Sequence, residues 1–271
     1  MADFRALQFN MQFGQAWDHH DPDNAPIDLD LTVREIRAQK ADIIFLQEVE
    51  QARPGGEQLN PPPNYTWLRS ALSEYDTFFS YPKNDPHELP FGIGLCILSR
   101  TPLRDTVRVD LPSPTIEFEF RGERRVPTDR LLIGARTTIA GQDLRIFNAH
   151  LLAFFMLNAS SDQHTSQRRR VLGEISASAA PTLLGGDFNV ARHETLLREF
   201  SDAGYRTVQA KEVTWRRRPY VLDHLFYNQW LRPVRNQVKP TAASDHHMVI
   251  ADFDFVSEAQ ARGIERPQGR R

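Results

Sequence analysis

Carboxylate, amide and imidazole side chains recur at the C-terminal ends of short apolar runs in this sequence. The runs LQFN, IIFLQE, RIFNAH and LLGGDFN show this pattern, and their polar ends are Asn10, Glu48, Asn148, His150, Asp187 and Asn189. Burying an ionised carboxylate costs several kcal/mol unless it is paired, hydrogen-bonded or bound to a metal ion. Each residue alone has an ordinary structural explanation, but the repeated pattern predicts one shared polar cleft.

Two further acid and histidine groups occur nearer the C-terminus. Asp223 and His224 lie inside the apolar run VLDHLF, and SDHH brings Asp245, His246 and His247 ahead of the last apolar run. Neighbouring residues of a strand face opposite sides of a sheet, so Asp223 and His224 cannot both face one cleft. The sequence leaves open whether His224 or His247 joins it.

The donor set of this predicted cleft is rich in oxygen. It offers carboxylates and amides together with histidines, and the chain contains neither a cysteine pair nor a helical His-x-x-x-His motif. Hard oxygen donors suit Mg²⁺ or Mn²⁺, which also accept water and phosphate oxygens as ligands. The sequence therefore favours Mg²⁺ or Mn²⁺ over zinc.

The elements that must position these groups are strands interleaved with helices. The apolar runs have the length and the flanking turn residues of β-strands. Apolar positions three or four residues apart predict helices over 31–39, 65–73, 167–177 and 193–202, and Thr32 with Glu35 is typical of a capping box. Together with strand-rich stretches such as 103–150, the pattern predicts an α/β protein in which two mixed sheets pack face to face with helices outside.

Length and composition bound the class of protein. With 271 residues, of which 40% are hydrophobic, the chain predicts one domain at 1–258, followed by a flexible polar tail at 259–271. A net charge of -2 gives no overall attraction to nucleic acid or anionic membranes. The chain shows no leader and no membrane-spanning stretch, and Cys96 is its one cysteine, so we expect a cytoplasmic protein without disulfides.

Taken in order, these blocks resemble the endonuclease/exonuclease/phosphatase superfamily. The resemblance rests on LQFN, FLQEVE, FNAHL, GGDFN, LDHLFYN and SDHH, and it extends from Asn10 to about Phe255. It implies a four-layered α/β sandwich like that of DNase I, with the active site at one edge of two packed sheets. It also implies hydrolysis of a phosphodiester or a phosphomonoester that depends on a divalent metal ion.

The resemblance also implies roles for single residues. The metal-site residues would be Glu48, Asn10 and Asp245. Asp187 is similar to the residue that aims or deprotonates the attacking water, and His246 resembles the histidine that contacts the phosphate and is often assigned as the base. Which of the two takes the proton stays open at this stage. Asp223 resembles the carboxylate that orients His246.

Further residues are expected to bind substrate or to stabilise charge. By resemblance His150 stabilises the charged transition state, and Asn189 and Asn148 are placed at the phosphate. In the segment HLLAFFMLNASSDQHTSQRRR, apolar side chains could contact an acyl chain or a base, while His164 and Arg168 could hold phosphate. Packing of that segment into the core is an equally good interpretation. Tyr220, just before the LDHLFYN block, is a candidate to line the substrate pocket, although core packing is the somewhat better interpretation.

The substrate class is not decided by the sequence. Glu48 is followed by Val49 and Glu50, and the central block reads FNAHL, which departs from the abasic-site endonucleases of the superfamily and is closer to its sphingomyelinase, deadenylase and phosphatase members. We therefore expect a phosphodiester as the substrate, with a small molecule, a lipid headgroup or a nucleotide as good an interpretation as nucleic acid. The alternatives are a DNA or RNA nuclease and a catalytically silent binding domain. The oligomeric state is not indicated.

Overall fold

The computed structural model describes residues 2–257, so the tail expected at 259–271 lies outside the described residues. One six-stranded sheet has the order β15-β16-β1-β2-β6-β4. Its strands are β1 (Phe4–Asn10), β2 (Ile43–Gln47), β4 (Asp76–Ser80), β6 (Leu95–Ser99), β15 (Leu231–Lys239) and β16 (Met248–Phe255). We call it the first sheet.

The second six-stranded sheet has the order β13-β14-β12-β11-β10-β7. Its strands are β7 (Arg104–Leu111), β10 (Arg130–Ile139), β11 (Gln142–His150), β12 (Thr182–Asp187), β13 (Arg206–Thr207) and β14 (Asp223–Tyr227). Two short ribbons complete the β-structure: β3 (Glu50–Gln51) with β5 (Gly92–Ile93), and β8 (Phe118–Phe120) with β9 (Glu123–Arg125).

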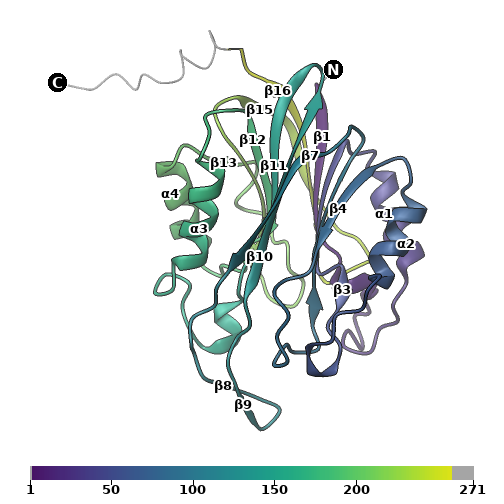
Figure 1. Ribbon diagram of the computed structural model, residues 1–271, viewed down its shortest axis with the longest axis vertical. Coiled ribbons are helices and arrows are strands. Elements are labelled where there is room, and N and C mark those ends of the chain that lie inside the picture. The colour runs from purple at the N-terminus through teal and green to yellow at the C-terminus, as the bar shows by residue number, and fades with distance from the viewer. Residues whose placement is uncertain (1, 258–271) are drawn as a thin grey trace, which may run out of the picture.

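Helices cover the outer faces of both sheets (Figure 1). Helices α1 (Leu29–Ala38) and α2 (Pro63–Ala71) lie on the first sheet, and α3 (Ser166–Ile175) and α4 (His193–Asp202) lie on the second. Three short 3-10 turns are η1 (Gln12–Gly14), η2 (Pro54–Gly56) and η3 (Phe154–Leu157). The result is the four-layered α/β sandwich that the sequence predicts.

Alternation along the central strands explains why both faces of each sheet are buried. In β2, Ile43 and Phe45 point into the apolar core between the sheets, whereas Ile44 and Leu46 pack under α1 and α2. This is the period of two that strand geometry imposes. Gly185 of β12 lets the sheets approach closely, because a Cβ there would lie 2.4 Å from the Phe45 ring. The apolar core therefore fixes the spacing between the two sheets.

Parallel pairing brings the polar strand ends to one edge of the sandwich. Strands β1 and β2 are parallel, with Asn10 opposite Gln47, and β11 and β12 are parallel, with His150 opposite Asp187. The C-terminal ends of parallel strands lie at the same edge. Each sheet therefore presents its polar ends at the same end of the molecule.

The structure corrects one local prediction. Helix α1 begins at Leu29, and its N-cap is Asp28, whose carboxylate accepts a hydrogen bond from the Leu31 N–H at 2.8 Å. Thr32 is buried inside the first turns and donates to the Asp28 carbonyl, so Thr32 and Glu35 do not form a capping box. Among residues 2–257, no helix is both long and apolar enough to cross a membrane.

Candidate active site

Asp187 lies at the centre of the polar edge, at the end of β12, with its side chain 1% exposed. Its Oδ2 accepts a hydrogen bond from Asn10 Nδ2 at 3.0 Å and lies 3.7 Å from His150 Nε2 and 3.8 Å from His246 Nε2. Its Oδ1 accepts from the backbone N–H of Asn189 at 2.9 Å. One buried carboxylate oxygen thus faces an amide and two imidazoles.

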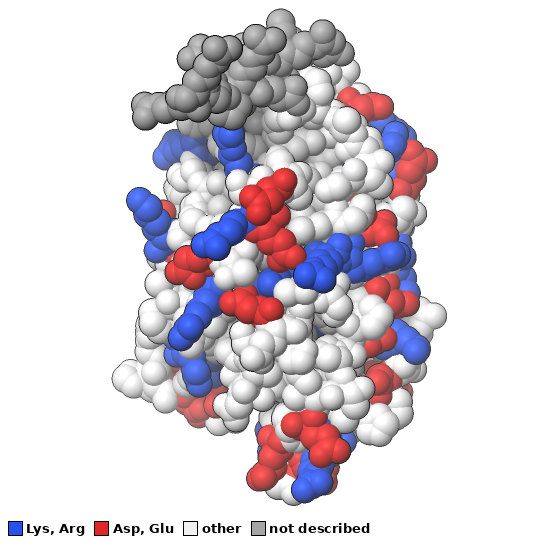
Figure 2. All heavy atoms as spheres, turned by 90° about the vertical axis from the view of Figure 1, so that its left-hand side faces the viewer, with Lys and Arg blue, Asp and Glu red and all other residues white. Residues whose placement is uncertain are grey.

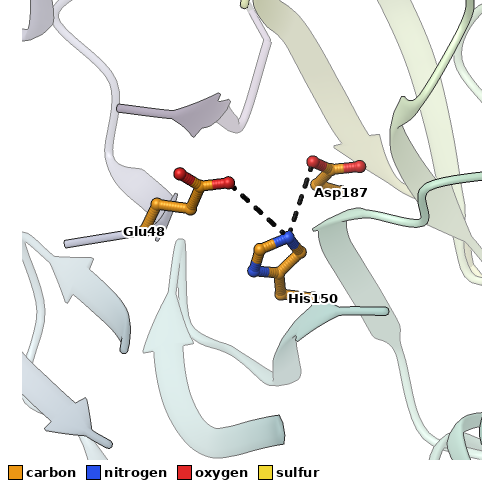
Figure 3. A group of neighbouring side chains, drawn as sticks. All are labelled: Glu48, His150 and Asp187. Carbon is orange, nitrogen blue, oxygen red and sulfur yellow. Dashed lines mark ion pairs between the residues drawn. The ribbon is translucent and has the colours of Figure 1, made fainter. Parts of the chain in front are cut away.

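Glu48 approaches the same point from the first sheet. It follows β2 directly with φ 50, a left-handed backbone conformation that turns its side chain into the site. Its Oε1 accepts from Asn10 Nδ2 at 3.0 Å and lies 3.8 Å from His150 Nε2; Figure 3 shows the imidazole between Glu48 and Asp187. Gly92 leaves room for Glu48, because a Cβ at Gly92 would lie 2.2 Å from Glu48 Oε2.

His246 is held from behind by Asp223. Its Nδ1 lies 2.8 Å from Asp223 Oδ2, and both side chains are buried. The other oxygen, Asp223 Oδ1, accepts from Gln8 Nε2 at 3.1 Å. This pairing fixes the tautomer in which Nδ1 carries a proton, so His246 turns Nε2 toward Asp187.

Burial shifts the pKa values of the two central carboxylates upward. Desolvation is the main cause for Glu48 and raises its pKa to about 7. Desolvation, followed by the negative charge of Asp223, likewise raises the pKa of Asp187. Both carboxylates are therefore harder to ionise than exposed ones. A cation bound beside them would stabilise their ionised forms.

The two histidines behave in opposite ways. Burial, followed by the positive charges of Arg130 and His246, holds the pKa of His150 well below its usual value, so this imidazole is neutral. Burial also opposes the charged form of His246, but the charge of Asp223 and its hydrogen bond outweigh burial and raise the pKa of His246. The site therefore combines a neutral imidazole donor with an imidazolium.

Asp245 stands on the far side of His246. Its Oδ1 lies 3.9 Å from His246 Nε2, and its Oδ2 accepts from Trp215 Nε1 at 3.1 Å and from Arg217 Nε at 2.7 Å. Its charge contributes to the raised pKa of Glu48. With Oδ2 held by two donors, Oδ1 is the oxygen that faces the site.

The amide of Asn10 is oriented by its neighbours. Its Oδ1 accepts from the backbone N–H of Gln12 at 3.1 Å, so Nδ2 points to Glu48 and Asp187. An amide nitrogen donates hydrogen bonds and does not ligate metals. In this arrangement Asn10 connects the two carboxylates as a donor, and its place in the metal site stays a prediction.

Two groups of side chains have donor atoms close enough to hold a metal ion. Within residues 2–257, the candidate atoms of Glu48, His150 and Asp187 lie within 4.8 Å of one another, as do those of Asp187, Asp223 and His246. Buried carboxylates with raised pKa values match the oxygen donors that Mg²⁺ and Mn²⁺ prefer. The residues present therefore suit a divalent cation.

Asn148 does not reach the site, contrary to the sequence prediction. It is fully buried between the sheets, where its Nδ2 donates to the carbonyls of Leu46 and Cys96. Its Oδ1 accepts from Gln47 Nε2 at 2.6 Å. All of these partners are inside the protein, so Asn148 ties the two sheets together and does not contact phosphate.

Arg168 is also wrong as a phosphate ligand. Its side chain is 3% exposed, and its guanidinium pairs with Glu199 at 2.9 Å and Asp162 at 3.2 Å. Helices α3 and α4 are therefore joined by a buried ion pair. Figure 2 shows blue and red side chains interspersed on the molecular face that includes these helices, without a continuous basic tract on that face.

The remaining candidates lie around the site. Tyr220 stacks on Trp215 with ring centroids 6.2 Å apart, and both rings contact Phe155. Trp215 in turn has its ring centroid 6.3 Å from that of His246, so this aromatic group adjoins His246 through Trp215. His164 instead stacks on Phe154, and the structure brings it to none of the charged groups described above.

Asn189 and the two ambiguous histidines are also placed. Asn189 adopts φ 50 and donates from Nδ2 to the Leu151 carbonyl at 3.1 Å. His224 points to the opposite face of β14 from Asp223 and contacts Phe188. His247 accepts from Arg216 Nε at 3.3 Å, outside the catalytic group. Strand alternation thus assigns Asp223, and not His224, to the site.

Two side chains that contact or influence the candidate site are not marked by the sequence pattern. Gln8 lies two residues before the end of β1 and supports Asp223, but inside a strand it resembles an ordinary polar residue. Arg130, which pairs with Glu88 at 3.5 Å, is close enough to influence the pKa values of Glu48 and His150. The sequence signal for Arg130 was its position at the start of β10, the strand that pairs with β11 and its FNAH residues.

Comparisons with known proteins agree with this geometry. The model of the endonuclease/exonuclease/phosphatase family matches residues 7–246. Among solved structures, a family protein from Beutenbergia cavernae is 20% identical, with 94% of this chain and 72% of that chain covered and a TM-score of 0.69. The human nocturnin catalytic domain is 17% identical, with 94% and 96% covered and a TM-score of 0.65.

A third similar structure is a mannosyl-6-phosphatase from Bacteroides thetaiotaomicron. It is 15% identical, with 93% of this chain and 100% of that chain covered and a TM-score of 0.66. No protein with a curated description matches the chain significantly by sequence. At these identities the structural likeness establishes the fold, and the family match rests on the sequence model.

Proposed function

The chain belongs to the endonuclease/exonuclease/phosphatase family, whose members hydrolyse phosphoesters, and from this premise we propose that it hydrolyses a phosphodiester or a phosphomonoester with Mg²⁺ or Mn²⁺. The observation that supports the proposal is the position of Asp187 Oδ2, between the Nε2 atoms of His150 and His246. An acid between two imidazoles at the edge of two sheets can aim water at a phosphorus atom.

In this proposal Glu48 and Asp245 Oδ1 would hold the cation, and Asn10 connects Glu48 and Asp187 by donating to both. A bound cation would neutralise the non-bridging phosphate oxygens and stabilise the leaving oxygen. The protein's own groups supply the rest of the chemistry. No zinc-type set of cysteine ligands is present, because Cys96 is the only cysteine and is buried.

Asp187 is the residue that we assign to orient and deprotonate water. Its Oδ1 is held by the Asn189 N–H, which leaves Oδ2 directed to the centre of the site. His246 keeps its proton because Asp223 raises its pKa, so its Nε2–H can donate to a phosphoryl oxygen. The neutral imidazole of His150, with its proton on Nε2, supplies a second donor to the charge that develops in the transition state.

The test is hydrolysis of bis(p-nitrophenyl) phosphate and p-nitrophenyl phosphate with Mn²⁺, with Mg²⁺ and with EDTA. The site variants are Glu48→Gln, Asp187→Asn and His246→Gln. Their exposed controls are Glu117→Gln, Asp143→Asn and His87→Gln, at side chains that are 69%, 66% and 68% exposed. We expect a fall of about 100- to 10,000-fold in the site variants only.

Unchanged hydrolysis in both Asp187→Asn and His246→Gln would refute these assignments. The substrate class needs a separate panel of nicked, abasic and single-stranded DNA, RNA, sphingomyelin, phosphatidylinositol phosphates and nucleotides, each with metal. Because a net charge of -2 gives little attraction to nucleic acid, we expect turnover of a lipid-headgroup or nucleotide ester. Turnover of abasic DNA alone would identify a nuclease, and turnover of none would favour a silent binding domain.

A further inference from the structure

A basic and aromatic hollow adjoins the candidate active site behind Asp245. Its volume is about 680 Å³, and its walls include Trp17, Trp215 and the three consecutive arginines 216–218. Trp215 belongs to both places, since its ring also lies beside the ring of His246. The hollow is therefore continuous with the wall of the catalytic group.

The three arginines of this hollow differ in how many ion pairs and hydrogen bonds they make. Arg217 pairs with Asp245 and with Asp23 at 2.6 Å, and Arg216 donates to His247 and to the carbonyl of Thr241. The side chain of Arg218 is exposed and makes no ion pair or hydrogen bond with residues 2–257. The hollow thus has three guanidinium groups and two paired carboxylates, those of Asp23 and Asp245. The guanidinium of Arg218 is free to bind an anion.

The other acidic residues near the hollow form no ion pair with Arg218 among the described residues. Asp18 accepts from the backbone of His20, and Asp21 accepts from Asn24, so both are engaged within their own loop. Trp17 meanwhile holds the arginine side chains in place: the Cζ atoms of Arg216 and Arg217 lie 5.5 and 5.7 Å from its ring centroid. Such stacking preorganises guanidinium groups for phosphate.

The hollow lies close to the reaction centre. Asp245 reaches Arg217 with one carboxylate oxygen and faces His246 with the other. Arg217, one of the three arginines of the wall, is therefore linked to His246 through a single carboxylate. A group in the hollow and a phosphate beside His246 could belong to one small molecule.

We propose that this hollow binds a second phosphate group of the substrate, adjacent to the scissile ester. The inference rests on the proposed phosphoesterase function and narrows its substrate to a bisphosphorylated small molecule. Arg218 supplies the main contact, because its guanidinium has no partner among the described residues. A long polyanion is disfavoured, since the net charge of the chain is -2.

Two chromogenic esters test the inference. Thymidine 5′-(p-nitrophenyl phosphate) and its 3′-phosphorylated form share the scissile bond and differ only in the second phosphate. A charge-assisted contact predicts that kcat/KM is about 10- to 100-fold higher for the 3′-phosphorylated ester, mainly through KM. Arg218→Gln should bring the ratio of the two kcat/KM values close to one. Arg235→Gln, an exposed arginine on β15, should keep the wild-type ratio.

A wild-type ratio near one, or an equal loss of the ratio in both variants, would overturn the inference. If neither ester is hydrolysed, the proposed function fails, and binding then tests the hollow alone. Thymidine 3′,5′-bisphosphate added in EDTA should quench tryptophan fluorescence saturably, with weaker binding to Arg218→Gln and a smaller signal in Trp17→Phe. Absence of saturable quenching would refute the subsite. Stronger competition by an oligothymidylate than by the nucleoside bisphosphate would refute the small-molecule assignment.

Discussion

Replacing Gly92 by alanine should weaken the proposed metal site without replacing any of its proposed ligands. Gly92 belongs to the β3–β5 ribbon, where it lies opposite Gln51. A Cβ there would lie 2.2 Å from Glu48 Oε2 and 2.3 Å from Glu48 Cβ. A shift of the flexible carboxylate could relieve the first contact, but the second involves an atom bonded to the backbone. Either Glu48 leaves its position or the ribbon moves away.

The size of the effect follows from what Glu48 is expected to do. Neighbours that orient metal ligands typically contribute about 10- to 100-fold in metal affinity or activity. That range corresponds to about 1.4 to 2.8 kcal/mol of binding free energy. Gly92 lies in a short ribbon at the rim of the sandwich, outside the three apolar core clusters. The fold should therefore persist while the affinity for Mn²⁺ falls.

The assay is a Mn²⁺ titration of ester hydrolysis, combined with the Tm measured in EDTA. Gly173→Ala is the matched control, because a Cβ at Gly173 would meet nothing within 4 Å and the residue lies inside helix α3. Alanine there should stabilise the protein by about 0.5 to 1 kcal/mol through helix propensity and leave metal affinity unchanged. Wild-type Mn²⁺ affinity in Gly92→Ala would refute the placement of Glu48 in the metal site.

Three further outcomes follow from the charges of the site and of the helical layer. Asp223→Asn removes the main group that raises the pKa of His246, so hydrolysis should fall by about 100- to 10,000-fold and the basic limb of the pH–rate profile should move to lower pH. Burial raises the pKa of Glu48 from 4.5 to about 7, so its contribution to stability is complete below about pH 4.5 and is lost as the pH rises through about 7. The Tm in EDTA should fall over that window, Glu48→Gln should flatten the fall, and added Mn²⁺ should stabilise the wild type more above about pH 7 than near pH 5. Arg168→Met leaves Glu199, whose side chain is 22% exposed, without its partner, which should cost about 1 to 3 kcal/mol in denaturant unfolding with KM unchanged; a raised KM at wild-type stability would instead support a phosphate contact.

The strand ends could be predicted because their chemistry and their geometry agree. Asn10, Glu48, His150 and Asp187 each follow an apolar run, and an unpaired carboxylate in such a place is costly. Parallel pairing then brings the ends to one edge, as the registers of β1 with β2 and of β11 with β12 show. The four helices were predicted for the same reason, since their apolar positions repeat with the helical period.

What the sequence could not predict depends on contacts between distant segments. Asn148 and His150 lie two residues apart on β11. His150 is the last residue of the strand and reaches the site, whereas Asn148 lies further inside and bonds Gln47 between the sheets. Arg168 looks like a phosphate ligand until Glu199, on the neighbouring helix, is placed against it. Strand β15 is mostly exposed and polar, so no alternation of apolar residues marked it.

The site is divided between the two sheets, and this division explains why its geometry is set by the apolar core. Glu48 and Asn10 come from the first sheet, whereas Asp187 and Asp223 come from the second. The bonds from Asn10 to Asp187 and from His246 to Asp223 therefore cross the interface between the sheets. Buried carboxylates with raised pKa values weaken this interface at neutral pH, so polar bonds alone cannot hold it at fixed spacing. Close-packed side chains between the sheets resist compression and separation, and they keep the catalytic atoms in reach of one another whatever the charge of the site.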